Sequence, residues 1–188
     1  MPNPCVRALV LAGALTLLAP VVTAPRNAEA ATEAQLRAQR TIAQIDRFRQ
    51  STWRLQELTG RERTPTFFAE RRTPDQAYRV WIRELWQKRA DRALRQAKAV
   101  PNRGAWQCIH RYERDPAQGW RTHTGNGYYG GLQMDLDFQR SYGPELLRRK
   151  GTANNWTWFE QMWVAERARR SGRGFTPWPN TARYCGLI

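Results

Sequence analysis

The sequence predicts an α+β fold that is mostly helical, with a helical N-terminal region and a C-terminal domain carrying one short β-hairpin. Residues 32–58 contain no Gly or Pro and place apolar side chains at helical spacing. A second helical stripe follows over residues 75–100. Residues 124–131 read Thr-Gly-Asn-Gly-Tyr-Tyr-Gly-Gly, which is typical of a tight turn or hairpin.

The first thirty residues have the pattern of a secretory signal. Arg7 precedes an apolar run over residues 8–22, which is shorter than the about 20 residues that a membrane span needs. Ala28 and Ala30 place small residues where a signal peptidase reads them. We therefore expect residues 1–30 to be a cleaved signal peptide, the mature protein to be secreted, and no integral membrane segment to remain. An uncleaved anchor is the alternative.

Residues 31–100 are expected to form a helical N-terminal region, either a hairpin or a spacer. The first helix ends at Thr59-Gly60, and a connection that contains Pro65 and Pro74 follows. The large apolar residues of this connection are Phe67 and Phe68. Asp75 begins the second helix, which ends before Pro101. The apolar stripe of this second helix consists of Tyr78, Trp81, Ile82, Leu85 and Leu94. The region is either a purely structural element or an arm whose arginines bind anionic wall polymer.

Residues 101–188 hold most of the Trp and Gly and two of the three cysteines. Short helices are expected over residues 103–113, 132–142 and 156–171, and a Pro- and Trp-bearing coil over 174–188. Cys5 leaves with the signal, so Cys108 and Cys185 remain, and one disulfide is expected between them in an oxidising compartment.

Charge and composition narrow the function. The chain has 31 Lys and Arg against 16 Asp and Glu, a net charge of +15. A mean hydropathy of −0.75 excludes a polytopic membrane protein, and 41% hydrophobic residues with nine Trp exclude a wholly disordered tail. Outside the cell, the abundant polyanions that a basic surface attracts are wall polymers and lipid headgroups, and the charge alone does not identify which of them is the partner. The export signal disfavours nucleic acid as a partner.

Several familiar sites are excluded by spacing. Gly125, Gly127 and Gly130 fit G-x-G-x-x-G, but no long apolar strand precedes them and no Lys-Ser/Thr follows. His110 and His123 lack the spacing of a zinc site. We expect no metal and no cofactor.

Glu113 is the candidate for acid catalysis, because it ends a short helix beside aromatic residues. Glycoside cleavage needs a carboxylic acid that stays protonated near neutral pH, and apolar walls favour that form. Sugar rings pack on flat aromatic faces, and nearby aromatic residues are Trp120, Tyr128, Tyr129 and Trp178. These residues alone leave a solvated surface Glu as an alternative.

The order of these residues adds a further indication. Trp106 lies seven residues before Glu113, Trp120 follows, and residues 124–133 read TGNGYYGGLQ. Ala165-Glu166 and then Trp178-Pro179 come later. This arrangement resembles the lysozyme-like catalytic domain of resuscitation-promoting factors and related transglycosylase-like proteins. The resemblance covers about residues 101–188 and leaves the helical region uncovered.

The resemblance implies a small lysozyme-like domain that cleaves the MurNAc–GlcNAc bond of peptidoglycan, as a lytic transglycosylase or a muramidase. Glu113 would be its single general acid, and the protein would be associated with the cell wall. Substrate-binding residues implied by the resemblance are Trp120, Asn126, Tyr128, Tyr129, Gln133 and Trp178. The alternative is a non-catalytic wall-binding module that keeps the fold.

Two departures from the family pattern concern the cleft and the disulfide. The loop between Glu113 and Trp120 is two residues longer than expected. In the family one Cys directly precedes the catalytic Glu, whereas here Tyr112 does so and Cys108 lies four residues earlier. Cys185 is displaced further along the chain as well. Four residues are about one helical turn, so both shifts fit one disulfide moved by a turn.

The second step of the reaction stays open. A hydrolase places a second carboxylate about 5 Å or 6.5–9.5 Å from the acid. Nearby candidates are Asp115, Asp135 and Asp137. Family members resemble lytic transglycosylases, in which one Glu suffices and the 6-hydroxyl of muramic acid closes a 1,6-anhydro ring. The resemblance favours the transglycosylase.

Overall fold

The computed structural model describes residues 26–188, apart from the side chains of residues 26–31 and Arg71. Residues 1–25 of the expected signal peptide lie outside the described residues. The contacts of the chain divide it into residues 1–36 and 37–188. The described part of the first unit is the beginning of α1 (Arg26–Leu58). None of the helices described is both long and apolar enough to span a membrane.

Three helices form the described N-terminal region, and two of them were predicted. α1 starts earlier than residue 32 and ends as predicted at Thr59-Gly60, where Gly60 has φ +68°. α2 (Phe68–Arg72) is a short helix that the sequence did not predict. α3 (Gln76–Lys98) begins as predicted after Asp75, whose carboxylate accepts a hydrogen bond from the Ala77 N–H.

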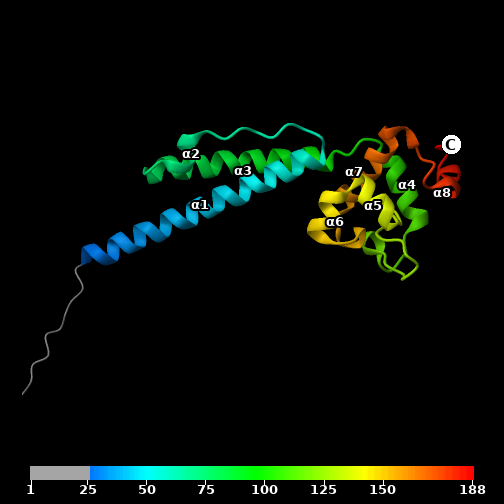
Figure 1. Cartoon of the computed structure of the whole chain (residues 1–188), viewed down its shortest axis with the longest axis horizontal. Coiled ribbons are helices and arrows are strands. Elements are labelled where there is room, and N and C mark those ends of the chain that lie inside the picture. Colours follow the sequence, from blue (N-terminus) through cyan, green and yellow to red (C-terminus); the bar gives the residue numbers. More distant parts are fainter. Residues whose placement is uncertain (1–25) are drawn as a thin grey trace, which may run out of the picture. The chain divides into compact units, whose positions relative to one another are not determined.

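Residues 37–58 of α1 and helix α3 lie side by side and run in the same direction (Figure 1). Gln76 at the start of α3 donates to Thr41 in the middle of α1, and further along both helices Trp53 and Trp86 make a T-shaped contact with ring centroids 6.0 Å apart. A hairpin would have made the two helices antiparallel. Extended residues cover about 3.3 Å each, so residues 59–67 return along about 20 residues of α1. Thr64 fixes this path by bonding to Trp53 and Gln56.

The buried face of α3 differs from the predicted stripe. Residues at helical spacing are buried, namely Ile82, Trp86, Ala90, Ala93 and Ala97. Tyr78 and Trp81 are instead exposed and stack on each other with ring centroids 5.4 Å apart. Phe67 and Phe68 are exposed as well. Ile82 of the predicted stripe is buried and Leu94 packs against the core, but Tyr78 and Trp81 are not part of the packing face, which small alanines complete.

The C-terminal domain is built from five α-helices within the described residues. α4 (Arg103–Glu113) has the predicted boundaries. The others are α5 (Leu136–Tyr142), α6 (Pro144–Lys150), α7 (Trp158–Ala168) and α8 (Pro179–Tyr184). Short 3₁₀ turns occur at Gly119–Arg121 and Ala153–Asn155, and a π-type turn at Arg169–Arg173. α8 replaces the expected coil, because Pro179 occupies its first turn, a favoured place for Pro in a helix.

The expected β-hairpin at residues 124–131 is absent from the structure. The described chain contains no strand, and this segment is a turn with isolated antiparallel bridges from Tyr129 to His123 and Met134. Gly125 and Gly127 both have positive φ and form the turn, but Tyr129 pairs singly with His123 and with Met134, so consecutive residues do not build a ladder. Over the described residues the fold is therefore mainly helical rather than α+β.

The core of the C-terminal domain surrounds the fully buried side chains of Trp106, Ile109 and Leu132. The predicted disulfide is confirmed, since Cys108 and Cys185 are bonded with Cα atoms 6.0 Å apart. It joins α4 to the end of α8 and closes a loop of 77 residues. In the chain-entropy model such a loop contributes about 4 kcal/mol to stability.

Candidate active site

Glu113 is the last residue of α4, and its half-buried side chain lines a cavity of about 380 Å³. Its carboxylate accepts a hydrogen bond from the hydroxyl of Thr181 on α8. The lining of the cavity is completed by Asn126, Tyr128, Gln133, Pro177, Trp178, Pro179 and Asn180. The carboxylate thus stands at a cavity with aromatic, amide and proline walls.

A second cavity of about 250 Å³ continues this space. It shares Tyr128, Gln133, Pro177 and Trp178 with the first. Its remaining lining is Met134, Asp135, Asp137, Phe138, Ser141 and Arg173. We call the two cavities together the cleft. A cleft in two parts has room for more than one unit of a chain-like ligand.

Of the expected binding residues, the structure brings Asn126, Tyr128, Gln133 and Trp178 together with Glu113. Tyr128 is 46% exposed, so its ring is open to a ligand. Trp178 is 4% exposed, and its indole N–H donates to the Leu132 carbonyl at 2.6 Å. Trp178 is therefore part core and part cleft wall.

Trp120 and Tyr129 do not line the cleft. The Trp120 ring stacks on His110 with centroids 3.7 Å apart and an interplanar angle of 9°. Tyr129 stacks on His123 at 5.1 Å. Both aromatic residues hold the glycine-rich turn against the domain, and both histidines are engaged with rings rather than gathered around a metal. No cluster of three or more metal-ligating side chains occurs in the described part of the chain.

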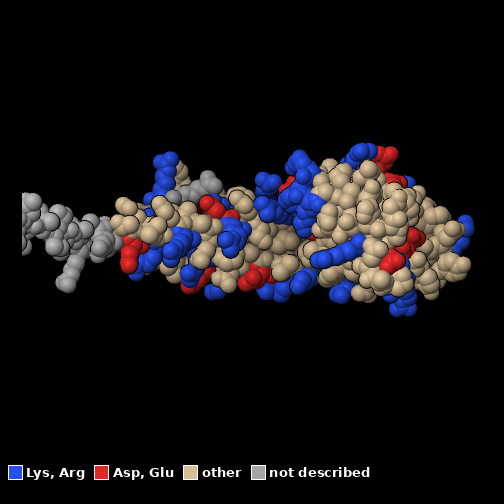
Figure 2. Space-filling view, turned by 90° about the horizontal axis from the view of Figure 1, so that it is seen from below, with Lys and Arg blue, Asp and Glu red and all other residues tan. Residues whose placement is uncertain are grey.

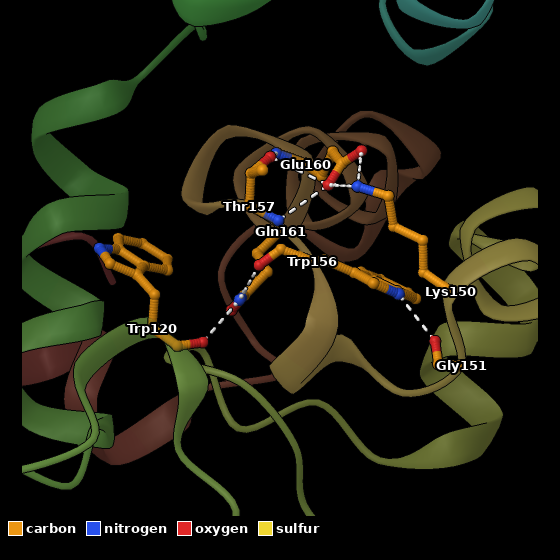
Figure 3. A network of polar contacts seen from close by, with 7 residues as sticks. All are labelled: Trp120, Lys150, Gly151, Trp156, Thr157, Glu160 and Gln161. Atoms are coloured by element: carbon orange, nitrogen blue, oxygen red, sulfur yellow. Dashed lines mark hydrogen bonds and ion pairs between the residues drawn. The ribbon is translucent and has the colours of Figure 1, made fainter.

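The glycine-rich turn is anchored by Gln161, a fully buried residue of α7 (Figure 3). Its amide nitrogen donates to the carbonyls of Trp120 and Trp156 at 2.8 and 3.1 Å. Its amide oxygen accepts from the Gly131 N–H at 2.8 Å. One buried side chain therefore fixes both flanks of the turn that carries Tyr128. Sequence reasoning missed Gln161, because nothing local distinguishes it from a surface Gln.

Gly130 and Gly131 are required by close packing. A Cβ on Gly130 would lie 2.5 Å from the Gln161 amide oxygen, and one on Gly131 would lie 2.4 Å from His110 Nδ1. His110 Nδ1 is 3.0 Å from the Gly131 carbonyl. Burial lowers the pKa of His110, the hydrogen bond to Gly131 opposes this, and the charge of Arg114 lowers the pKa further. The neutral imidazole then donates to Gly131 and holds the turn.

The start of α7 is itself fixed, which sets the position of Gln161. Thr157 and Glu160 form a capping box. Lys150 donates to both oxygens of Glu160 at 2.8 and 2.7 Å, as Figure 3 shows. Trp156 donates its indole N–H to the Gly151 carbonyl at 2.8 Å. These contacts place α7 against α6 and hold the anchor of the turn in register.

The three aspartates considered as second carboxylates have other roles in the structure. Asp115 accepts from the N–H groups of Ala117 and Gln118 and closes the turn after α4. Asp135 caps the N-terminus of α5, and Asp137 is 89% exposed and paired with Arg140. Asp135 and Asp137 line the second cavity, whereas Glu113 is the sole carboxylate among the described residues that line the first.

Thr181, which sequence reasoning did not identify, contacts the Glu113 carboxylate, and we expect it to position that group. We expect Thr181→Val, which keeps the shape and removes the hydroxyl, to lower turnover about tenfold, the cost of one hydrogen bond to a charged group. Thr181→Ser should restore turnover, while the melting temperature of both variants stays near the parent value. Muropeptide release under saturating substrate measures this. Equal losses in the Ser and Val variants would show that the residue acts through packing alone.

Comparison with known proteins agrees with this geometry. Residues 100–181 match the family model of the transglycosylase-like domain. The chain is also similar to resuscitation-promoting factor RpfE of Mycobacterium tuberculosis (strain ATCC 25618 / H37Rv), with 41% identity over 64 residues. The aligned segment covers 34% of this chain and 34% of that relative. Residues 100–181 are therefore similar to the transglycosylase-like domain, and the chain has distant similarity to resuscitation-promoting factor RpfE.

Proposed function

We propose that the protein is a secreted, wall-associated enzyme that cleaves the MurNAc–GlcNAc bond of peptidoglycan, with Glu113 as general acid. The observation that carries this proposal is the position of Glu113. It lines a cavity of about 380 Å³ within the region that matches the transglycosylase-like domain, beside Tyr128 and Trp178. The disulfide between Cys108 and Cys185 supports an oxidising compartment.

In this proposal Glu113 donates its proton to the glycosidic oxygen as the bond between that oxygen and C1 of MurNAc breaks. The GlcNAc side leaves as an alcohol, and Glu113 is left as a carboxylate. Tyr128 offers an exposed ring face to a sugar. Asn126, Gln133 and Asn180 line the same cavity with amide groups suited to sugar hydroxyl and acetamido groups.

For the second step we propose a lytic transglycosylase. The C6 hydroxyl of the same MurNAc attacks C1, and the Glu113 carboxylate accepts the proton released, which gives a 1,6-anhydro product. The single carboxylate among the described lining residues of the first cavity supports this route, because Asp115 and Asp135 are engaged as caps. A hydrolase would need a carboxylate free to activate water or to bond C1.

Mass spectrometry of the muropeptides released from purified sacculi tests the proposal. We expect products lighter by one water than reducing muropeptides, formed by the protein and not by Glu113→Gln. Glu84→Gln, which changes an exposed residue paired with Arg83, is the matched control and should release the same products as the parent. Reducing products would overturn the transglycosylase step. Binding to sacculi without any release of muropeptides would reject the enzyme proposal and support a wall-binding module.

A further inference from the structure

The N-terminal helices contain a groove that is distinct from the cleft. It lies between α1, the returning connection and α3, and it has a volume of about 540 Å³. Its lining residues are Thr52, Gln56, Arg61, Glu62, Thr64, Arg89, Arg92, Ala93 and Gln96. We call it the arginine groove. Three guanidinium groups thus face one space together with a single carboxylate.

The arginines of this groove keep most of their hydrogen-bonding capacity. Arg61 and Arg92 are exposed, and neither makes an ion pair or side-chain hydrogen bond within residues 26–188. Arg89 is held in place by the Trp86 ring, 4.6 Å away, and by Glu70 at 3.9 Å. Its Nη1 is the atom that faces Glu70; it is buried and has no hydrogen-bond partner in the described structure, so Arg89 adds charge to the wall while Arg61 and Arg92 supply the accessible donors. One fixed and two unpaired guanidinium groups create a positive groove that a bound anion would neutralise.

Among the neutral residues of the groove, Gln96 offers an amide donor and acceptor, whereas the Thr52 hydroxyl is buried and donates to the Phe48 carbonyl. Gln56 and Thr64 bond to each other and hold the connection that carries Arg61. Gln96 and Thr52 line the wall between the helices. A ligand that alternates charged and hydroxylated units would meet guanidinium and amide groups in turn. Figure 2 shows that Lys and Arg side chains lie over the helical region as well as over the C-terminal domain.

We propose that the arginine groove binds a wall polymer whose main chain carries phosphodiester groups. Guanidinium groups pair with phosphate oxygens in a two-pronged geometry. A polymer charged along its main chain can lie in a groove, whereas the carboxylates of peptidoglycan branch off on its stem peptides. Placing this polymer in the cell wall rests on the proposed function. The groove would then hold the enzyme on the wall while the cleft cuts the glycan.

Titration calorimetry tests this inference. It measures the binding of poly(glycerol phosphate) to the full protein at several salt concentrations. We expect Arg61→Gln with Arg92→Gln to weaken binding at least about tenfold. The slope of log K against log salt concentration should fall by about one for each guanidinium removed. Arg40→Gln with Arg47→Gln removes the same charge from exposed positions of α1 outside the groove, and should leave the affinity nearly unchanged.

Three outcomes would overturn the inference. Equal weakening by the Arg40 and Arg47 substitutions would mean that net charge alone attracts the polymer. Equally tight binding of polyglutamate of the same length would reject the phosphodiester. Tighter binding of DNA, or of phosphatidylglycerol vesicles, would assign the groove to another partner. Glu113→Gln should bind poly(glycerol phosphate) as tightly as the parent does. A negative result for the arginine groove would therefore not affect the muropeptide test of the proposed enzyme.

Discussion

Replacing Glu113 by Gln is expected to slow the release of muropeptides from sacculi by about 10²–10⁴-fold, the usual contribution of a general acid. The carboxyl group supplies the proton to the leaving oxygen, whereas the amide of Gln cannot act as an acid near neutral pH. Initial rates of soluble muropeptide release, measured on the same batch of sacculi, give the ratio. An unchanged rate would show that Glu113 is not the acid.

The same variant should fold normally, which separates a chemical defect from a structural one. The Gln amide oxygen can still accept the hydrogen bond from Thr181, so the contact between α4 and α8 is retained. The disulfide that joins the same two helices is unaffected. We expect the melting temperature to change by less than about 2 °C, the effect of about 0.5 kcal/mol in a protein of this size.

Local signals account for what the sequence predicted correctly. The boundaries of α4, the Asp75 cap of α3 and the end of α1 at Gly60 all follow from residues adjacent in the chain. The disulfide follows from the cysteine count once an oxidising compartment is assumed. The positions of Asn126, Tyr128 and Gln133 in the cleft follow from one continuous segment of sequence.

Other features depend on contacts between distant residues, and no local pattern encodes them. The parallel arrangement of α1 and α3 is set by the path of residues 59–67, which Gln56 fixes through Thr64. Trp120 and Tyr129 were expected in the cleft because they are aromatic, but each stacks on a histidine instead. Aromatic side chains serve a core and a sugar site equally well, so residue type alone cannot separate the two.

Glu166 is the second position where a single substitution should have a large effect, here on stability. Its side chain is fully buried in the core at the end of α7. Its carboxylate accepts from Arg169 at 2.8 and 2.9 Å, from Arg170 at 3.0 Å and from the Trp106 indole at 3.3 Å. Asn102, which has φ +53° at the start of α4, donates to it at 3.2 Å. One carboxylate therefore ties α4 to α7.

We expect Glu166→Gln to lower the free energy of unfolding by about 3 kcal/mol. Breaking a buried ion pair costs about 3–5 kcal/mol, and the low end applies because Arg169 and Arg170 can turn partly into water. The corresponding fall in melting temperature is about 6–12 °C. Urea unfolding monitored by Trp fluorescence measures it. Glu84→Gln is the exposed control and should change stability by less than about 0.5 kcal/mol.

Removing the Glu166 carboxylate should also affect the cleft, although Glu166 does not line it. Trp106 donates to Glu166 and packs against Trp178, with ring centroids 5.4 Å apart. Trp178 forms a wall of both cavities. Without the carboxylate, the Trp106 indole loses a charged acceptor, and the wall becomes less well fixed. We therefore expect the turnover of Glu166→Gln to decline more steeply than that of the parent protein when both are heated. Muropeptide release measured at several temperatures gives the comparison.

The pH dependence of stability identifies the carboxylate as the cause. Burial alone would raise the pKa of Glu166, but the hydrogen bonds from Arg169, Asn102 and Arg170 outweigh burial and hold the pKa below 4.5. A lowered folded pKa gives a stabilisation that is complete above about pH 4.5 and is lost as the pH falls through the folded value. The parent protein and Glu166→Gln should therefore differ most near neutral pH and converge below pH 4.5. A difference that stays constant from pH 7 to pH 3 would mean that packing, and not charge, makes Glu166 important.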